Sequence, residues 1–239
     1  MKKILIILII LPIITKAQSW KDLKKAVEKV NIDLIKGNSF SEEEAVNALK
    51  ETLKKGTEKG VSILSLKNGY FGNLKVKIPF PENAIKIAEK LNQLGMQKQV
   101  DEVVLSINRA AEDAAITAKP IFLDVIKEIS IKDAIGIVKG KKTAGTDYLN
   151  RNTNLALVSA FKPIIKRSLD KVNATKHWES IMTTYNKIPF VKNVSPELET
   201  YVTEKAISGL FFMLAQQETA IRENPKERTT ALLKKVFGN

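Results

Sequence analysis

Apolar residues recur at helical spacing along most of the chain, which predicts a succession of α-helices. The clearest stretch runs from 100 to 114, where valine, isoleucine and alanine return every three or four residues and give a helix one apolar face. Ser41 lies three residues before Glu44, and Ser130 three before Asp133, which is the spacing of a serine that caps the first turn of a helix. The pattern predicts one compact all-α domain, a bundle of about eight to ten helices.

Three stretches leave alternatives open. The pattern from 143 to 172 predicts one long helix or two, with a kink at Pro163. The stretch near 66–80 combines glycine and asparagine with alternating apolar residues, which predicts a short irregular or extended segment. We interpret its start as an ordinary turn, and backbone amides exposed to an anion are the alternative. The last helix, from 230 to 237, is expected to dock on the core, with a membrane surface as the alternative.

The N-terminus has the three parts of a secretory signal. Two lysines precede an apolar run from Ile4 to Ile14, and the small residue Ala17 follows shortly after. The run has about half the length of a membrane-spanning helix, although an uncleaved anchor or a buried helix is the alternative. We therefore expect cleavage of residues 1–17 as a signal peptide and export of residues 18–239 to the periplasm. No lipid anchor is expected, because the chain has no cysteine.

Composition narrows the classes of function. Lysine and arginine number 39 against 26 acidic residues, so the formal net charge is +13, and it falls to +10 without residues 1–17. The lack of cysteine and the single histidine, His177, argue against metal sites and a Ser–His pair, and we expect no metal or cofactor. The lysines are scattered and aromatic residues make up only 6%, so we expect anionic envelope surfaces rather than nucleic acid as partners. After the signal no apolar run reaches about 18 residues, so no transmembrane span is expected.

Polar side chains gather on one face of the helix predicted around Arg109. They are Asp101, Glu102, Ser106, Asn108, Arg109, Glu112 and Asp113. A guanidinium among carboxylates can bind a carboxylate or phosphate, and two carboxylates can act as general acid and base. The alternative is a buried ion-pair network or a solvated face. We take as candidate ligand-binding residues Glu102, Asn108, Arg109, Glu112 and Asp124, and assign no catalytic or metal-binding residue.

Several motifs follow one another in an order that resembles a known family. The first part of the chain contains Lys55-Gly56-Thr57-Glu58, Asn68 to Asn73 and Ile78-Pro79-Phe80-Pro81. The middle contains Ser106 to Glu112, and the end contains Tyr201 to Ala206 followed by Arg228-Thr229-Thr230. Over about residues 40–238 the chain is similar to the family named domain of unknown function 4197. The resemblance implies an exported, helical bacterial protein of unassigned activity, and it implies no catalytic residues.

Two classes of function remain open. We expect a non-catalytic binding or structural protein whose partner is an anionic amphiphile, such as a lipid or another anionic small molecule, or an envelope protein. The alternative is a carboxylate-dependent hydrolase or lyase that uses Glu102, Glu112 or Asp124. A water-accessible pocket lined by two carboxylates would favour the enzyme, and a dry tunnel would favour lipid carriage. A filled core with an exposed apolar patch would favour a partner. The oligomeric state stays open.

Overall fold

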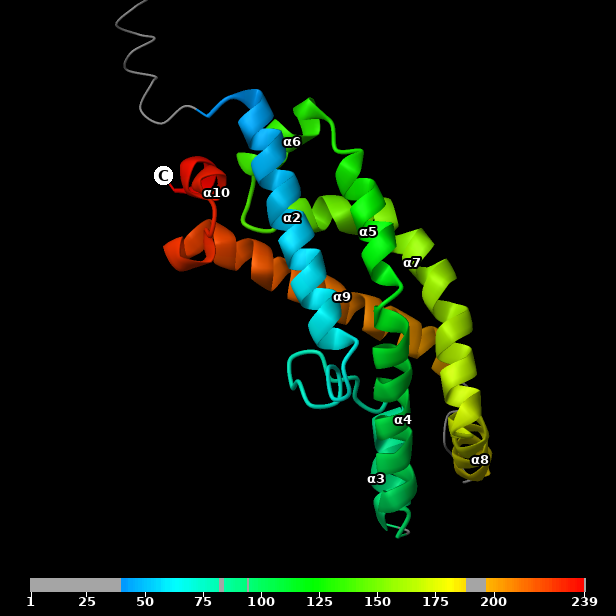
Figure 1. Cartoon of the computed structure of the whole chain (residues 1–239). Coiled ribbons are helices and arrows are strands. Elements are labelled where there is room, and N and C mark those ends of the chain that lie inside the picture. The colour runs from blue at the N-terminus through cyan, green and yellow to red at the C-terminus, as the bar shows by residue number, and fades with distance from the viewer. Residues whose placement is uncertain (1–39, 82–83, 94, 188–196, 239) are drawn as a thin grey trace, which may run out of the picture. The chain divides into compact units, whose positions relative to one another are not determined.

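The computed structural model describes residues 40–81, 84–93, 95–187 and 197–238 (Figure 1). The predicted signal peptide lies outside these residues. The described part of the chain contains nine α-helices, one short 3₁₀ turn and no strand, which confirms the all-α prediction. None of these helices is both long enough and apolar enough to cross a membrane.

The helices are α2 (Glu42–Leu64), α3 (Ile85–Gln93), α4 (Gln97–Ala115), α5 (Ala118–Lys127), α6 (Ile131–Val138), α7 (Ala144–Lys171), α8 (Ala174–Asn186), α9 (Leu198–Glu223) and α10 (Ala231–Phe237). The 3₁₀ turn is Pro225–Glu227. The pattern from 143 to 172 is a single helix, α7, which contains Pro163 at an exposed position.

The two predicted serine caps are confirmed. The Ser41 hydroxyl accepts a hydrogen bond from the Glu44 amide at 3.1 Å, and the Glu44 carboxylate accepts one from the Ser41 amide at 2.8 Å. The Ser130 hydroxyl accepts from the Asp133 amide at 3.1 Å. These caps satisfy first-turn amides that would otherwise lack a partner, so they fix where α2 and α6 begin.

Helix α9 lies at the centre of the domain and packs against α2, α4 and α7. Figure 1 shows α2 crossing α9 near its middle, while α4 and α7 run beside each other on the opposite side of the crossing from α10. Leu210 and Leu214 are buried, and Phe211 meets Phe122 of α5 edge-on with 5.5 Å between ring centroids. An almost uniformly apolar stretch of helix is expected at such a central position.

The C-terminal helix α10 docks on the core. Leu233, Val236 and Phe237 are buried with Ala48 of α2 and Ile221 of α9 in a second, smaller apolar cluster. Two polar contacts join the same elements. The Lys235 ammonium lies 2.6 Å from the Glu44 carboxylate, and the Thr230 hydroxyl donates to Glu51 at 3.2 Å. Lys235, together with the amide of Ser41, holds the pKa of Glu44 below its usual value.

Residues 65–81, which we call the α2–α3 loop, form turns and an extended stretch without a strand partner. Its alternating apolar residues Val76, Ile78 and Phe80 are buried, as a strand-like pattern predicts. Phe80 packs on Trp178 of α8 with 5.2 Å between ring centroids. The loop therefore needs partners for its backbone polar groups, and α4 supplies them through side chains.

Candidate functional site

Three of the five candidate residues, Asn108, Arg109 and Glu112, lie together on α4 and face the α2–α3 loop. Residues three or four apart share one side of a helix, so this grouping follows from the helical spacing. The loop reaches this side of α4 from the end of α2 (Figure 1). Each of the three side chains contacts a different part of the loop.

Glu112 binds the turn of the loop. It is only 4% exposed, and its Oε1 accepts hydrogen bonds from the amides of Tyr70 and Phe71, both at 3.1 Å. Its Oε2 lies 2.5 Å from the Arg109 guanidinium. Both carboxylate oxygens are therefore engaged, and the buried charge is compensated by an opposite charge and two amides.

Asn108 binds the extended stretch of the loop as a strand neighbour would. It is fully buried, accepts from the Ile78 amide at 2.8 Å and donates to the Ile78 carbonyl at 2.7 Å. Its side-chain nitrogen also donates to the Val104 carbonyl at 2.7 Å, so both N–H groups of the side-chain amide have an acceptor. One side chain thus satisfies both backbone groups of a buried residue that has no strand beside it.

Arg109 connects Glu112 to the start of the turn. Its guanidinium donates to the side-chain oxygen of Asn68 at 2.8 Å and lies 5.7 Å from the centre of the Phe71 ring. Asn68 has a φ of 70°, a left-handed conformation that asparagine adopts more easily than most residues. The arginine therefore holds a turn residue whose backbone is unusual.

Tyr70 attaches the same turn to the central helix. Its hydroxyl donates to the Ala206 carbonyl at 2.6 Å, and its ring is fully buried against α9. Burial, with the Glu112 carboxylate as a second cause, raises the pKa of the Tyr70 phenol far above its usual value. Gly209 permits this contact, because a Cβ at that position would lie 2.7 Å from the Tyr70 ring.

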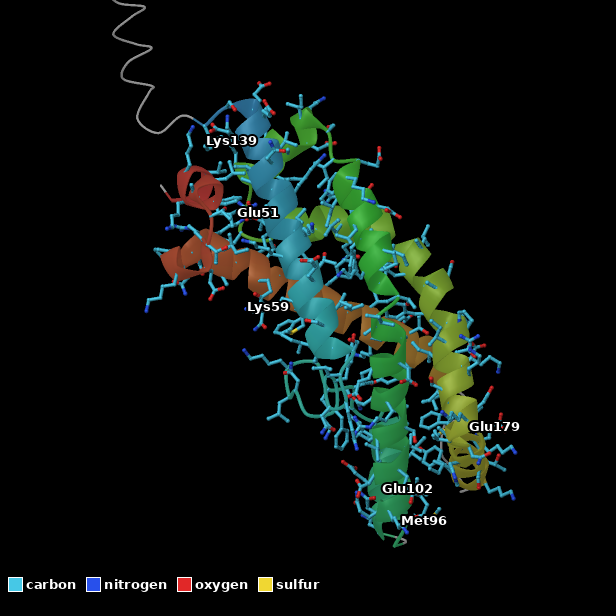
Figure 2. All side chains as sticks on the ribbon, viewed as in Figure 1. Glu51, Lys59, Met96, Glu102, Lys139 and Glu179 are labelled. Carbon is cyan, nitrogen blue, oxygen red and sulfur yellow. The ribbon has the colours of Figure 1, made fainter. Side chains whose placement is uncertain are left out.

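The other two candidates, Glu102 and Asp124, do not join this cluster. Glu102 is half exposed, 4.0 Å from Lys98, and Figure 2 places it near the lower end of α4. Asp124 lies on α5 with its side chain 72% exposed, 2.9 Å from Lys127. Both belong to surface ion pairs, which contribute little to stability. The structure therefore assembles Asn108, Arg109 and Glu112 around the loop and leaves Glu102 and Asp124 apart.

A second buried carboxylate, Glu218 of α9, was missed by the sequence analysis. It is 1% exposed and accepts from the amides of Gly145 and Thr146, at 3.0 and 2.8 Å, at the start of α7. The N-terminal end of a helix favours a negative charge at this position. A Cβ on Gly145 would lie 3.0 Å from the Glu218 carboxylate, so glycine permits the approach.

Arg222 pairs with Glu218, and Arg228 lies close by at the end of α9. Arg222 donates to Glu218 at 2.9 Å and to the carbonyls of Ile137 and Val138, both at 3.0 Å. Arg228 donates to the carbonyls of Ile221 and Arg222 near the end of α9. The sequence did offer one indication of this ion pair: Glu218 and Arg222 are four residues apart, so they share one face of a helix.

An open pocket lies between α7, α8 and the start of α9. Its volume is about 520 Å³, which is within the usual range for small-molecule sites. Its wall includes Lys162, Lys166, Trp178, Met182, Glu197 and Glu199. Glu199 lies 3.9 Å from Lys162 and 4.0 Å from Lys166, so it pairs loosely with both ammonium groups. The sequence analysis named none of these as candidate site residues.

Within the described residues no three His, Cys, Asp or Glu side chains are grouped so that they could hold a metal ion. His177 is exposed on α8. A family model described as "Protein of unknown function (DUF4197)" matches residues 39–238. Comparison with curated proteins and comparison with solved structures each gave no match.

Proposed function

Because the chain belongs to the DUF4197 family, whose function is unknown, we propose from its own residues that it is an exported, non-catalytic protein that binds a small anionic amphiphile. The observation that carries this proposal is the pocket between α7, α8 and α9, whose wall combines two lysines with apolar side chains and also contains Glu179, Glu197 and Glu199. The N-terminal pattern of a secretory signal supports the export.

The pocket wall contains both kinds of group that an amphiphile needs. Lys162 and Lys166 lie one helical turn apart on α7, so both ammonium groups can bind one carboxylate or phosphate. Their distances to Glu199, close to 4 Å, are too long for hydrogen bonds, and Lys166 also lies 3.5 Å from Asp170. An ammonium group has three N–H donors, so both lysines keep donors for a ligand. Leu169, Trp178 and Met182 provide an apolar surface for a hydrocarbon chain.

The buried carboxylates support a role without chemistry. Glu112 and Glu218 each accept hydrogen bonds from two backbone amides and contact an arginine. A general acid or base needs an oxygen that can reach the substrate. In both residues the carboxylate oxygens instead hold a loop or a helix end in place.

A second candidate function is a carboxylate-dependent hydrolase or lyase that works in the same pocket. The observation in its favour is the presence of Glu197 and Glu199 in the wall of a water-accessible site. Two carboxylates in one pocket can act as acid and base. These are not the carboxylates that the sequence analysis considered for an enzyme, so this candidate rests on the pocket alone.

The test uses Trp178 as a reporter of binding. The chain has two tryptophans, and replacing Trp20 by phenylalanine leaves Trp178 as the sole tryptophan signal. Titration with laurate should change its emission, with an affinity that falls but does not vanish as salt rises. The double variant Lys162→Gln/Lys166→Gln should bind about tenfold more weakly, which corresponds to roughly 1.4 kcal/mol.

The control is Lys54→Gln, an exposed lysine of α2, which removes one charge and should leave the affinity nearly unchanged. Equal laurate affinity in the double variant and in the parent would contradict the proposal. Turnover of ester or phosphoester substrates that is lost in Glu199→Gln would support the enzyme instead.

A further inference from the structure

The α2–α3 loop exposes two leucines. Leu74 is 89% exposed and Leu66 is 64% exposed, the two highest values among the exposed large apolar residues of the described chain apart from Leu155 of α7. A single exposed leucine is ordinary on a protein surface. This loop of seventeen residues exposes two leucines next to lysines. Folding alone does not require this arrangement.

The loop is also strongly basic. Between 65 and 81 the sequence contains Lys67, Lys75 and Lys77 and no acidic residue. Lys77 lies 4.4 Å from the centre of the Phe71 ring, and none of the three lysines forms an ion pair within the described part of the chain. Figure 2 shows nitrogen-tipped side chains extending outward from the loop. Their positive charge is therefore available to a partner.

The contacts described above anchor this loop at several points. Glu112 and Asn108 bind its backbone from α4, and Tyr70 binds α9. Leu74 follows Asn73, whose side chain accepts from the Lys75 amide at 3.2 Å and whose carbonyl accepts from the Val76 amide. Presenting an exposed leucine on an ordered turn removes part of the entropic cost of placing it in a partner.

We infer that the α2–α3 loop binds the surface of an anionic lipid bilayer, with Leu74 and Leu66 entering the boundary between headgroups and hydrocarbon. Lys67, Lys75 and Lys77 then lie at the level of the lipid phosphates. This inference goes beyond binding of an amphiphile in the pocket and does not depend on it, because the two sites share no residue.

The composition of the loop favours a lipid surface over a protein partner. A stable protein interface buries about 1,200–2,000 Å² in total and is depleted in lysine. Two leucines within a cluster of lysines provide little apolar area for such an interface. Membrane association needs less area, because each inserted apolar side chain and each nearby lysine contributes separately.

The test measures sedimentation of the full chain with vesicles of phosphatidylcholine mixed with phosphatidylglycerol, and with vesicles of phosphatidylcholine alone. The first should bind the chain more strongly, and added salt should weaken that binding. Leu74→Ser should lower the partition coefficient about tenfold or more. Lys75→Gln should lower it roughly fivefold.

Matched controls separate the loop from the rest of the chain. Leu155→Ser removes a leucine that is 83% exposed on α7, and Lys132→Gln removes an exposed lysine of α6, near the other end of α2. All variants keep the apolar N-terminus, so its own affinity for lipid cancels. The controls should change binding less than twofold, because Lys132→Gln removes one distant, screened charge and Leu155→Ser removes an apolar side chain outside the loop.

Equal vesicle binding by Leu74→Ser and Leu155→Ser, or no binding by the parent chain, would overturn the inference and leave the leucines to a protein partner. Unchanged thermal unfolding of Leu74→Ser, expected from its exposure, excludes misfolding as the cause of lost binding. The laurate titration of Trp178 should be unaffected by Leu74→Ser, so failure of the loop and failure of the pocket give different results.

Discussion

Glu112 is the residue on which the conformation of the α2–α3 loop most directly depends. A single carboxylate replaces the water that two amides of the turn would otherwise bind, and it neutralises the guanidinium of Arg109. Hydrogen bonds that involve a buried charge are stronger than neutral ones, and their loss leaves several groups without partners at once. The conformation of the loop therefore depends strongly on this one side chain.

Replacing Glu112 by glutamine should therefore destabilise the protein by about 2–4 kcal/mol. The amide nitrogen of glutamine would face the Arg109 guanidinium, a donor against a donor. Urea unfolding followed by circular dichroism measures the change. Glu102→Gln on the same helix is the control and should cost less than about 1 kcal/mol, because Glu102 forms a surface pair. Equal costs for the two variants would show that the Glu112 contacts contribute nothing specific.

The raised pKa of Tyr70 predicts that the free energy of unfolding depends on pH in the alkaline range. Its pKa is raised in the folded protein, so above about pH 10 the unfolded chain loses this proton while the folded chain keeps it. The free energy of unfolding should then fall by up to about 1.4 kcal/mol per pH unit as pH rises. Below pH 10 both states hold the proton, and this contribution does not vary.

The comparison is with Tyr70→Phe, which has no proton to lose at this position. The variant should be less stable by about 1 kcal/mol at neutral pH, because the Ala206 carbonyl loses its donor. The difference between the two proteins should shrink above pH 10. Burial and the nearby Asp133 also raise the pKa of Tyr148, but that residue is present in both proteins. A constant difference across pH 9 to 11 would refute the assignment.

At the scale of elements, the spacing of residues predicted the features that involve residues close together in the sequence, namely helix caps and helix faces. The caps at Ser41 and Ser130 and the shared face of Asn108, Arg109 and Glu112 follow from spacings of three or four residues. Their partners in the loop do not, because the Ile78 and Tyr70 amides lie 30 and 42 positions away from the side chains that bind them. Only tertiary packing brings these groups together.

The burial of Glu218 could not be predicted from the sequence for a different reason. It stands among glutamine, threonine and arginine in the second half of α9, a composition typical of a solvent-exposed face. Its burial results from the approach of α7, whose first amides meet the carboxylate through Gly145 and Thr146. A polar stretch of sequence does not reveal that another helix end will cover it.

Helix α10 is a short element whose stability comes from packing, because seven residues do not form a stable helix alone. Leu233 is fully buried against α2 and α9, so Leu233→Ala should cost about 2–4 kcal/mol. Lys234→Ala, exposed on the same helix, is the control and should change stability by less than about 0.5 kcal/mol. Thermal unfolding of both variants measures the difference, and equal shifts would mean that α10 is not part of the cooperative core.

At the scale of the whole molecule, the sequence was sufficient for the fold class and insufficient for the pocket. Helical periodicity predicts a bundle because every helix must bury its apolar face. The pocket is a gap between helices, lined by residues from α7, α8 and the start of α9. Such a gap depends on how the helices are placed, and no single stretch of sequence encodes it.

The prediction of export belongs to the same scale. Chain purified from the envelope fraction of its own cells should have an intact mass that corresponds to a chain beginning at Gln18, because the residues before it match the pattern of a cleavable signal. Loss of these residues removes three lysines and lowers the net charge to +10. Recovery of the full-length chain from the cytosol alone would contradict the prediction.

The contact between α10 and α2 determines when the domain can be completed. Lys235 and Glu44 are 191 positions apart in the sequence. Helix α2, the first described helix to leave the ribosome, therefore cannot form this contact until α10, the last described helix, has been made. Until then the apolar surface around Ala48 and Ile221 stays open, as is typical of partly made domains. A chain cut short before residue 231 keeps that surface exposed, which makes it a target for chaperones and proteases. The C-terminal helix thus makes the stability of the fold conditional on a finished chain.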